Sequence, residues 1–286
     1  MPVARTLIIT MVAMLAFAAN SVLCRLALAK AGLDPLVFTA VRLASGAAML
    51  AALLIWRNRR AAEPNTGILL AHGNWRAAMA LLVYAAAFSL AYISLPAGSG
   101  ALLLFGAVQA TMVARGLMLG HRLGISQWLG LAFALAGVTV LMAPGVAAPS
   151  PVGAALMLLA GMAWGFYSLL GLKGGDALAA TTGNFLRAAP IALGLALLLG
   201  QMRDSSADGL AYAVLSGAAA SGLGYALWYR ALTGLTPHQA ASVQLSVPVI
   251  TTLGAALTLG ESITLRLILA SGAVLGGIAL VVRGKR

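Results

Sequence analysis

The sequence predicts an all-helical membrane protein whose ten transmembrane helices form two inverted repeats of five. Composition is the first reason, because 62% of the 286 residues are hydrophobic and only 8% are charged. A soluble domain carries about 25% charged residues, and a mean hydropathy of +0.99 indicates that most of this chain lies in lipid. These values exclude a soluble globular protein, a disordered chain and, despite the net charge of +12, a nucleic-acid-binding protein.

The second reason is a series of ten apolar stretches, each near the roughly 20 residues that a membrane-spanning helix needs. Between polar or Gly/Pro breaks they cover residues 6–30, 35–56, 75–95, 98–118, 125–143, 151–172, 179–200, 209–230, 238–258 and 265–283. The first stretch follows Arg5 like a secretory signal, but it continues to Leu33, which is the length of a span. Ten spans leave little chain for a soluble domain.

The basic residues predict which ends of the spans face the cytoplasm. With a cytoplasmic N-terminus, twelve Lys and Arg residues lie inside: Arg5, Arg57, Arg59, Arg60, Arg76, Arg115, Arg122, Lys173, Arg230, Arg283, Lys285 and Arg286. Only four lie outside, namely Arg25, Lys30, Arg203 and Arg266. Both termini are therefore expected to be cytoplasmic, in the inner membrane.

The third reason is internal repetition. Leu119-Gly120 and Leu259-Gly260 each precede an apolar stretch, and a glycine follows seventeen residues after the first glycine in both halves. Pro96 and Pro237 mark the tight turn before the fourth span of each half. Halves 1–145 and 146–286 thus hold five spans each, and an odd number inverts the second copy. Inverted repeats are typical of secondary transporters, which alternate around a site near the midplane.

These motifs resemble the EamA repeat of the drug/metabolite transporter superfamily. The second half carries the resemblance in Ala231-Leu232, Thr236-Pro237, Ala240-Ala241, Ser246-Val247-Pro248-Val249, Leu259-Gly260-Glu261, Gly272 and Gly277. The first half, from Ala101 through Gln109 and Leu119-Gly120 to Gly137, is a weaker copy.

The resemblance implies a ten-helix fold of two inverted five-helix repeats and a transport activity. Within the superfamily the chain is similar to the YddG-type exporters of aromatic and other amino acids. One departure is His121, which stands where the family has a Glu matching Glu261. The loop contact of that carboxylate is left open in the first half.

Signatures of enzymes and metal sites do not occur. His72, His121 and His238 lack metal-ligand spacing, and the chain has neither a G-x-S-x-G nor a Walker A motif. We therefore expect no catalysis, no metal and no cofactor, and transport that is secondary or facilitated.

The acidic residues all lie in predicted loops or at span ends: Asp34, Glu63, Asp176, Asp204, Asp208 and Glu261. A proton-coupled exporter of cationic drugs needs a carboxylate within the membrane. The sequence therefore favours facilitated movement down a gradient.

Two arginines lie within predicted spans, Arg42 and Arg187. An arginine at the centre of a span costs about 2.5–3.5 kcal/mol, so each needs a role. Arg42 lies about 12 Å along a helix from Asp34 and could pair with other residues of the bundle or reach the outer surface with its long side chain. The alternative is that one or both contact a substrate carboxylate.

Polar and aromatic residues near mid-span are the candidates for a substrate cavity, or else bridge helices. They are Asn20, Tyr84, Phe88, Tyr92, Gln109, Trp164, Tyr167 and Gln244. Substrate would stack on Trp164, while the amides of Asn20 and Gln109 hold its polar end. Pro248 could act as a hinge or simply kink its helix. The small-residue pair Gly272 and Gly276 would form a helix-packing face.

The function expected from these residues is export of amino acids, aromatic ones preferred, by alternating access. The partners are then the lipid bilayer and a small-molecule substrate, with no nucleic acid. A monomer is sufficient, and the sequence leaves the oligomeric state open. The alternatives are an exporter of a nucleobase or a cationic drug, and an intramembrane enzyme.

Overall fold

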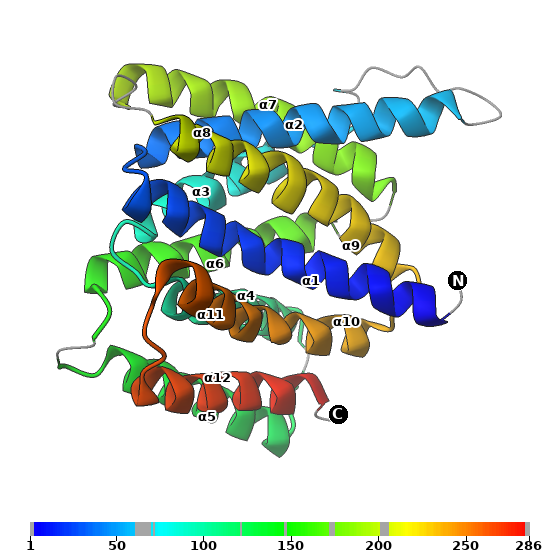
Figure 1. Cartoon of the computed structure of the whole chain (residues 1–286). Helices are drawn as coiled ribbons and strands as arrows, with labels where there is room; N and C mark the ends of the chain where they lie inside the picture. The colour runs from blue at the N-terminus through cyan, green and yellow to red at the C-terminus, as the bar shows by residue number, and fades with distance from the viewer. Residues whose placement is uncertain are drawn as a thin grey trace.

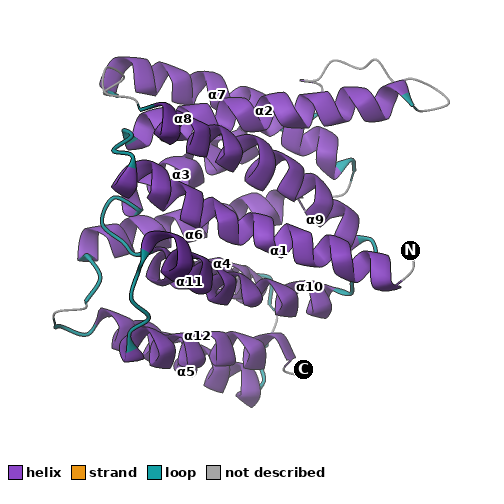
Figure 2. Ribbon diagram, in the orientation of Figure 1, coloured by secondary structure: helices purple, strands orange, loops and turns teal. Residues whose placement is uncertain are grey.

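The computed structural model of the chain is a bundle of helices that cross it in alternating directions (Figure 1). It describes residues 3–60, 70, 72–120, 122–145, 148–171, 175–200 and 206–283, but not the side chains of residues 237 and 238. Every regular element in these ranges is a helix (Figure 2). Nine of the described helical segments have the length and apolar character of a membrane span, and a shorter apolar helix is the tenth. The predicted fold class is confirmed.

The first half contains five spans in the predicted order. They are α1 (Val3–Arg25) with a π-helical last turn η1 (Leu26–Lys30), α2 (Pro35–Arg59), α3 (Trp75–Ala91), α4 (Ala97–Met118) and α5 (Ile125–Met142). Helix α2 begins where the Asp34 carboxylate accepts hydrogen bonds from the amides of Leu36 and Val37, which are unpaired in the first helical turn. Helix α3 ends four residues before its predicted limit, because Pro96 disfavours helical backbone in the residue before it.

The second half also contains five spans, but two of them are irregular. They are α6 (Pro151–Gly171), α7 (Ala177–Leu199), a span of α8 (Ala207–Val214), π-helical η4 (Leu215–Leu223) and α9 (Gly224–Leu232), a span of α10 (Pro237–Gln244) and α11 (Ser246–Leu259), and α12 (Leu265–Arg283). The break between α10 and α11 lies at Leu245 rather than at Pro248. Since Pro248 has no amide hydrogen for the carbonyl of Gln244, the interruption falls one turn before the proline.

The spans are arranged so that each half packs against the other. Helix α2 lies beside α7, α1 lies against α9 and α11, and α6 packs on α3 and α4 (Figure 1). Helices α5 and α12 pack together at the edge of the bundle. Both described chain ends, Val3 and Arg283, lie at one end of the bundle, here named the termini end (Figure 1). The other is the opposite end.

The packing of α5 on α12 corrects one expectation. A Cβ on Gly130 would lie 2.5 Å from the carbonyl oxygen of Gly277, and one on Gly137 would lie 2.7 Å from the Val274 side chain. Gly272 and Gly276 have no atom within 4 Å of such a Cβ and are exposed. The contact face of α12 therefore contains Gly277, because the predicted small-residue pair points away from α5.

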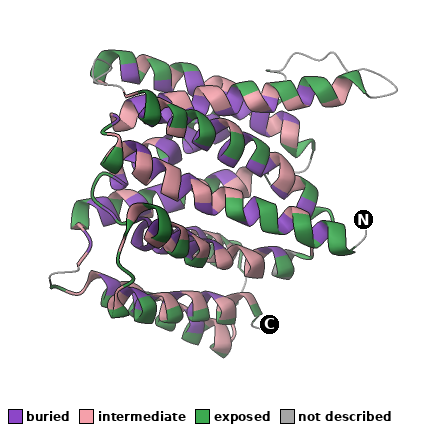
Figure 3. Ribbon diagram, in the orientation of Figure 1, coloured by how far each residue is buried: buried purple, intermediate pink, exposed green. Residues whose placement is uncertain are grey.

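The outer surface of the bundle is apolar. Leu198, Ile125 and Leu257 are more than four-fifths exposed, and exposed positions follow the outward faces of the helices (Figure 3). Such a surface is suited to lipid rather than water. The sequence predictions that concern Glu63, His121, Lys173, Arg203, Asp204, Lys285 and Arg286 lie outside the described residues.

Candidate functional site

Arg42 lies in the interior of the bundle and does not reach its surface. The side chain is 2% exposed, its Nη2 donates to the Tyr84 hydroxyl at 3.0 Å, and its Nε donates to Ser221 Oγ at 3.3 Å. The interpretation that Arg42 extends to the outer surface is therefore wrong. Its partners come from α3 and η4, so it joins the two halves.

The Arg42 guanidinium has no acidic partner among the described residues, whose two ion pairs involve other arginines. Its Nη1 is buried without a hydrogen-bond partner there. Its Cζ lies 4.8 Å from the Phe88 ring centroid and 5.2 Å from that of Tyr84. Ring faces attract a cation, but burial of an ion costs several kcal/mol. Arg42 is thus a buried positive charge whose donor nitrogen Nη1 has no acceptor among the described residues.

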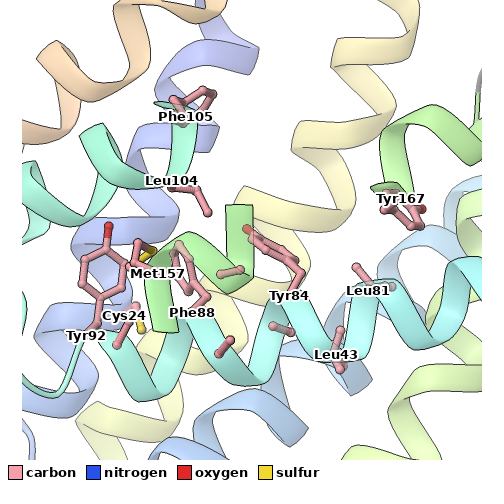
Figure 4. Close-up of a cluster of buried hydrophobic side chains, with 14 of the residues drawn as sticks. Cys24, Leu43, Leu81, Tyr84, Phe88, Tyr92, Leu104, Phe105, Met157 and Tyr167 are labelled. Atoms are coloured by element: carbon pink, nitrogen blue, oxygen red, sulfur yellow. The ribbon is translucent and has the colours of Figure 1, made fainter. Parts of the chain in front are cut away.

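Aromatic rings from both halves stack beside this charge. Trp164 stacks on Tyr167 and on Tyr225, each with a ring-centroid distance of 5.2 Å, and the Tyr84 ring lies 4.9 Å from the Trp164 ring with its plane tilted by 45°. The predicted shared side of Trp164 and Tyr167 is observed. Figure 4 shows Tyr84 and Phe88 along α3, with Tyr167 on the neighbouring α6. We name Tyr84, Trp164, Tyr167 and Tyr225 the aromatic stack.

Asn20 lies close to this site, but its amide is already bonded. Ser216 Oγ donates to Asn20 Oδ1 at 2.6 Å, and Asn20 Nδ2 donates to Ser221 Oγ at 3.2 Å. All three side chains are buried. Asn20 therefore bridges α1 to η4, as the alternative reading of such polar residues proposed.

The remaining predicted residues occupy different places. Gln109 and Gln244 are half-buried. Tyr92 makes an edge-to-face contact with Phe88 at a ring-centroid distance of 4.7 Å, but it lies at the end of α3, where its hydroxyl donates to the carbonyl of Ala97. The sequence grouped Tyr92 with the mid-span residues because it follows Phe88 by four positions.

Arg187 is engaged at the termini end. Its Nη1 donates to the carbonyls of His72 and Gly183, and its Nη2 donates to the carbonyl of Leu70. The guanidinium thus holds the chain before α3 against α7. Because backbone carbonyls already accept from both terminal nitrogens of Arg187, Arg42 is the arginine of the candidate site.

An ion pair joins the two halves at the opposite end. Arg25 Nε donates to Glu261 Oε1 at 3.0 Å, and Arg25 Nη1 donates to the carbonyl of Tyr92 at 2.9 Å. The second carboxylate oxygen of Glu261 accepts from the amide of Ala97 at 2.7 Å. Gly260, with φ +67°, turns the chain after α11 so that Glu261 reaches these partners. We name Arg25 and Glu261 the opposite-end latch.

A separate cavity of about 220 Å³ lies between α4, α5 and α12. Its lining is mainly apolar, with Arg122 and Gln127 as its polar members. None of its residues belongs to the aromatic stack or contacts Arg42. We place the candidate site at Arg42 because of its buried charge, its vacant donor and the aromatic rings beside it.

Comparisons with known proteins agree with this architecture. The pattern of the EamA-like transporter family matches residues 4–143 and again residues 151–283. The chain belongs to the EamA-like transporter family. This EamA-like transporter is 59% identical over 282 residues to a Pseudomonas aeruginosa protein named only as uncharacterized, covering 98% of this chain and 96% of the relative. A crystal structure of a protein with 18% identity shares the fold, with a TM-score of 0.67 and coverage of 95% and 94% of the two chains.

The candidate site of this EamA-like transporter also contains three residues that the sequence did not predict: Ser216, Ser221 and Tyr225. A signal for Tyr225 exists, because it precedes Pro237 by twelve residues, as Tyr84 precedes Pro96. No helical periodicity indicates the two serines, since they lie in the π-helical segment η4.

Proposed function

We propose that this EamA-like transporter is a secondary transporter that exports amino acids, aromatic ones preferred, across the inner membrane. Its halves, residues 1–145 and 146–286, would alternate around a site formed by Arg42 and the aromatic stack. Both termini would be cytoplasmic, in accord with the excess of basic residues at the termini end.

The observation that carries the proposal is the buried Arg42 guanidinium with a vacant Nη1 and no acidic partner among the described residues. A substrate carboxylate would supply the missing negative charge and accept hydrogen bonds from Nη1 of Arg42. Arginine binds carboxylates through two parallel hydrogen bonds, which Lys cannot reproduce. An amino acid carries this group whatever its side chain.

The aromatic preference rests on the aromatic stack. Tyr84 belongs to the stack and also bonds Arg42, so a ligand whose carboxylate meets Arg42 would hold its side chain near these rings. Two tyrosines stack on Trp164, and the ring of a substrate would replace one of them. Gln109 and Gln244 stay candidates for its amino group, together with Tyr84, Phe88, Tyr92, Trp164, Tyr167 and the bridging Asn20 around the site.

Nucleobases and cationic compounds are the competing substrates. A nucleobase would stack on Trp164, but it offers no carboxylate to Arg42. A cationic drug would add a second positive charge beside Arg42, which has no ion-pair partner among the described residues, and like charges in a medium of low dielectric repel strongly. Arg42 therefore favours carboxylates over both classes.

Liposomes that contain only the purified transporter would test this proposal. We expect saturable uptake of labelled L-phenylalanine without an applied gradient, inhibited by L-tryptophan and not by adenine or ethidium. Arg42→Lys and Arg42→Gln should lower the apparent affinity for L-phenylalanine about tenfold or more, since a bond to a charged group contributes about 1.5–3 kcal/mol. Inhibition by adenine or ethidium alone would contradict amino-acid export.

A further inference from the structure

The eighth span contains an unusual π-helical segment, η4, that covers Leu215–Leu223. Its hydrogen bonds join residues five apart, whereas an α-helix joins residues four apart. Such segments are rare and occur often at functional sites. In this transporter η4 lies directly against Arg42 and Asn20.

The π-helical geometry brings two serines to the same side. Ser216 and Ser221 are five residues apart, and both hydroxyls contact the amide of Asn20. Residues five apart in an α-helix do not share a face, because its neighbours are three and four apart. The wider turn of η4 is therefore what allows both serines to face α1.

Ser221 has a second partner that Ser216 lacks. Its Oγ accepts from Arg42 Nε at 3.3 Å as well as from Asn20 Nδ2 at 3.2 Å. Tyr84 accepts from Nη2 of the same guanidinium, so two of its three nitrogens are fixed and Nη1 is left vacant.

The backbones of η4 and α2 approach closely where Ser221 contacts Arg42. A Cβ on Gly217 would clash with the carbonyl oxygen of Arg42 and with Ser45 Oγ, and one on Gly46 would lie 3.1 Å from the carbonyl oxygen of Gly217. Glycine at both positions lets the two backbones meet. Arg42 and Ser221 are thus held by helices in direct contact.

We propose that Ser221 is a positioning residue, which the π-helical turn of η4 places so that Arg42 presents Nη1 to a substrate carboxylate. The inference rests on the proposed function, because it takes the ligand of Arg42 to be a carboxylate. Without the Ser221 oxygen, Nε of Arg42 loses its hydrogen-bond acceptor, and the guanidinium rotates toward a different acceptor. Nη1 is then no longer held toward the substrate, and selection for a carboxylate weakens.

Competition measurements in liposomes separate this role from simple helix bridging. L-tryptophan and L-tryptophan amide differ only in the carboxylate, and each competes with labelled L-phenylalanine. For the unmodified transporter we expect the acid to inhibit at about tenfold lower concentration than the amide, as a bond to a charged group would give. Ser221→Ala should reduce this preference several-fold.

Ser216→Ala is the matched control, because Ser216 is equally buried and contacts Asn20 but not Arg42. It should change inhibition by the acid and the amide by the same factor. Ser221→Thr, which keeps a hydroxyl, should retain the preference if the protein elutes as a single species.

The outcomes distinguish the two proposals. If the unmodified transporter does not prefer the acid, or Arg42→Gln leaves its preference intact, both proposals are overturned. If Arg42→Gln abolishes the preference while Ser221→Ala retains it, amino-acid binding at Arg42 stands and the positioning role of Ser221 is refuted. Equal effects of Ser216→Ala and Ser221→Ala on the preference would also refute it, because only Ser221 contacts Arg42.

Discussion

Arg25 and Glu261 form an ion pair with an N–O distance of 3.0 Å between residues 236 positions apart in the chain. The pair lies at the opposite end of the bundle and connects the first half to the second. The second carboxylate oxygen of Glu261 accepts a hydrogen bond from the amide of Ala97, and Nη1 of Arg25 donates one to the carbonyl of Tyr92. An alternating mechanism requires such contacts to break when this end opens.

Glu261→Gln should therefore favour opening at the opposite end. The substitution removes the charge but keeps the shape, and charge-assisted hydrogen bonds contribute about 1.5–3 kcal/mol. We expect a thiol at Leu95→Cys, a buried position at this end, to react about tenfold faster with a maleimide. The measurement uses a Cys24→Ser background, since Cys24 is the single cysteine.

Arg266→Gln provides the control for this measurement. Arg266 donates to the carbonyls of Ala143 and Pro144 at the same end, but it contacts neither member of the opposite-end latch. In the Arg266→Gln variant, the thiol introduced by Leu95→Cys should react with the maleimide at the same rate as in the protein with Arg266 intact. If both substitutions accelerate labelling equally, or neither does, the latch does not control access at this end.

Helix packing between α5 and α12 gives a prediction with a control on the adjacent residue. A Cβ on Gly277 would lie 2.6 Å from the amide nitrogen of Ala134, so Gly277→Ala should destabilise the protein by about 1–3 kcal/mol. Gly276→Ala meets no atom within 4 Å and should leave stability unchanged or raise it slightly. Thermal unfolding in detergent would compare the two. A lower Tm for Gly276→Ala than for Gly277→Ala would mean that α12 is rotated.

The sequence predicted the spans well because each is long, apolar and bounded by breaks. It also identified Leu119-Gly120 and Leu259-Gly260, whose glycines both have positive φ, +84° and +67°. The local spacing of Trp164 and Tyr167 correctly placed both rings on one side. These are properties of single helices, which a periodic pattern records directly.

Contacts between helices were harder to predict. Arg42 could be recognised as costly in a membrane, but its partners Tyr84 and Ser221 lie on other elements. Ser221 depends on a π-helical turn that a 3.6-residue period does not describe. The error with Gly272 and Gly276 has the same origin, because small residues occur on two faces of α12 and only the position of α5 selects between them.

Acid should destabilise the protein through Asp176. Burial alone would raise the pKa of this carboxyl, but its hydrogen bonds to Arg57 and to the amides of Ala179 and Leu178 outweigh burial and lower the pKa. The folded pKa therefore lies below the unfolded value of about 3.9. The contribution to stability is present above that value and is lost as pH falls through the folded pKa.

We expect Tm to be nearly constant between about pH 8 and pH 5 and to fall below about pH 4. Asp176→Asn should lower Tm at neutral pH and flatten the acid part of the profile. The effect is small because the pair is partly exposed, with side-chain exposures of 42% for Arg57 and 36% for Asp176. An unchanged acid slope in Asp176→Asn would assign the acid sensitivity to another group.

The proposed orientation predicts which loops face the periplasm. Ala148 lies between α5 and α6 at the opposite end, whereas Leu119 follows α4 at the termini end. In the Cys24→Ser background, Ala148→Cys should react with an impermeant thiol reagent in intact cells. Leu119→Cys should react only after lysis. The reverse pattern would place both termini outside and contradict the proposed direction of insertion.

Trp164 offers a test of the preference for aromatic substrates. Trp164→Ala removes the central ring of the aromatic stack, which contacts Tyr84, Tyr167 and Tyr225. An aromatic pair contributes about 0.5–1.5 kcal/mol beyond burial, so the KM for L-tryptophan and L-phenylalanine should rise about fivefold. Threonine cannot stack, and its KM should change much less. Because any general damage to the bundle would affect all three amino acids alike, the ratio of their KM values in liposomes is the quantity to measure. Equal losses would show that Trp164 packs the helices and that the substrate binds elsewhere.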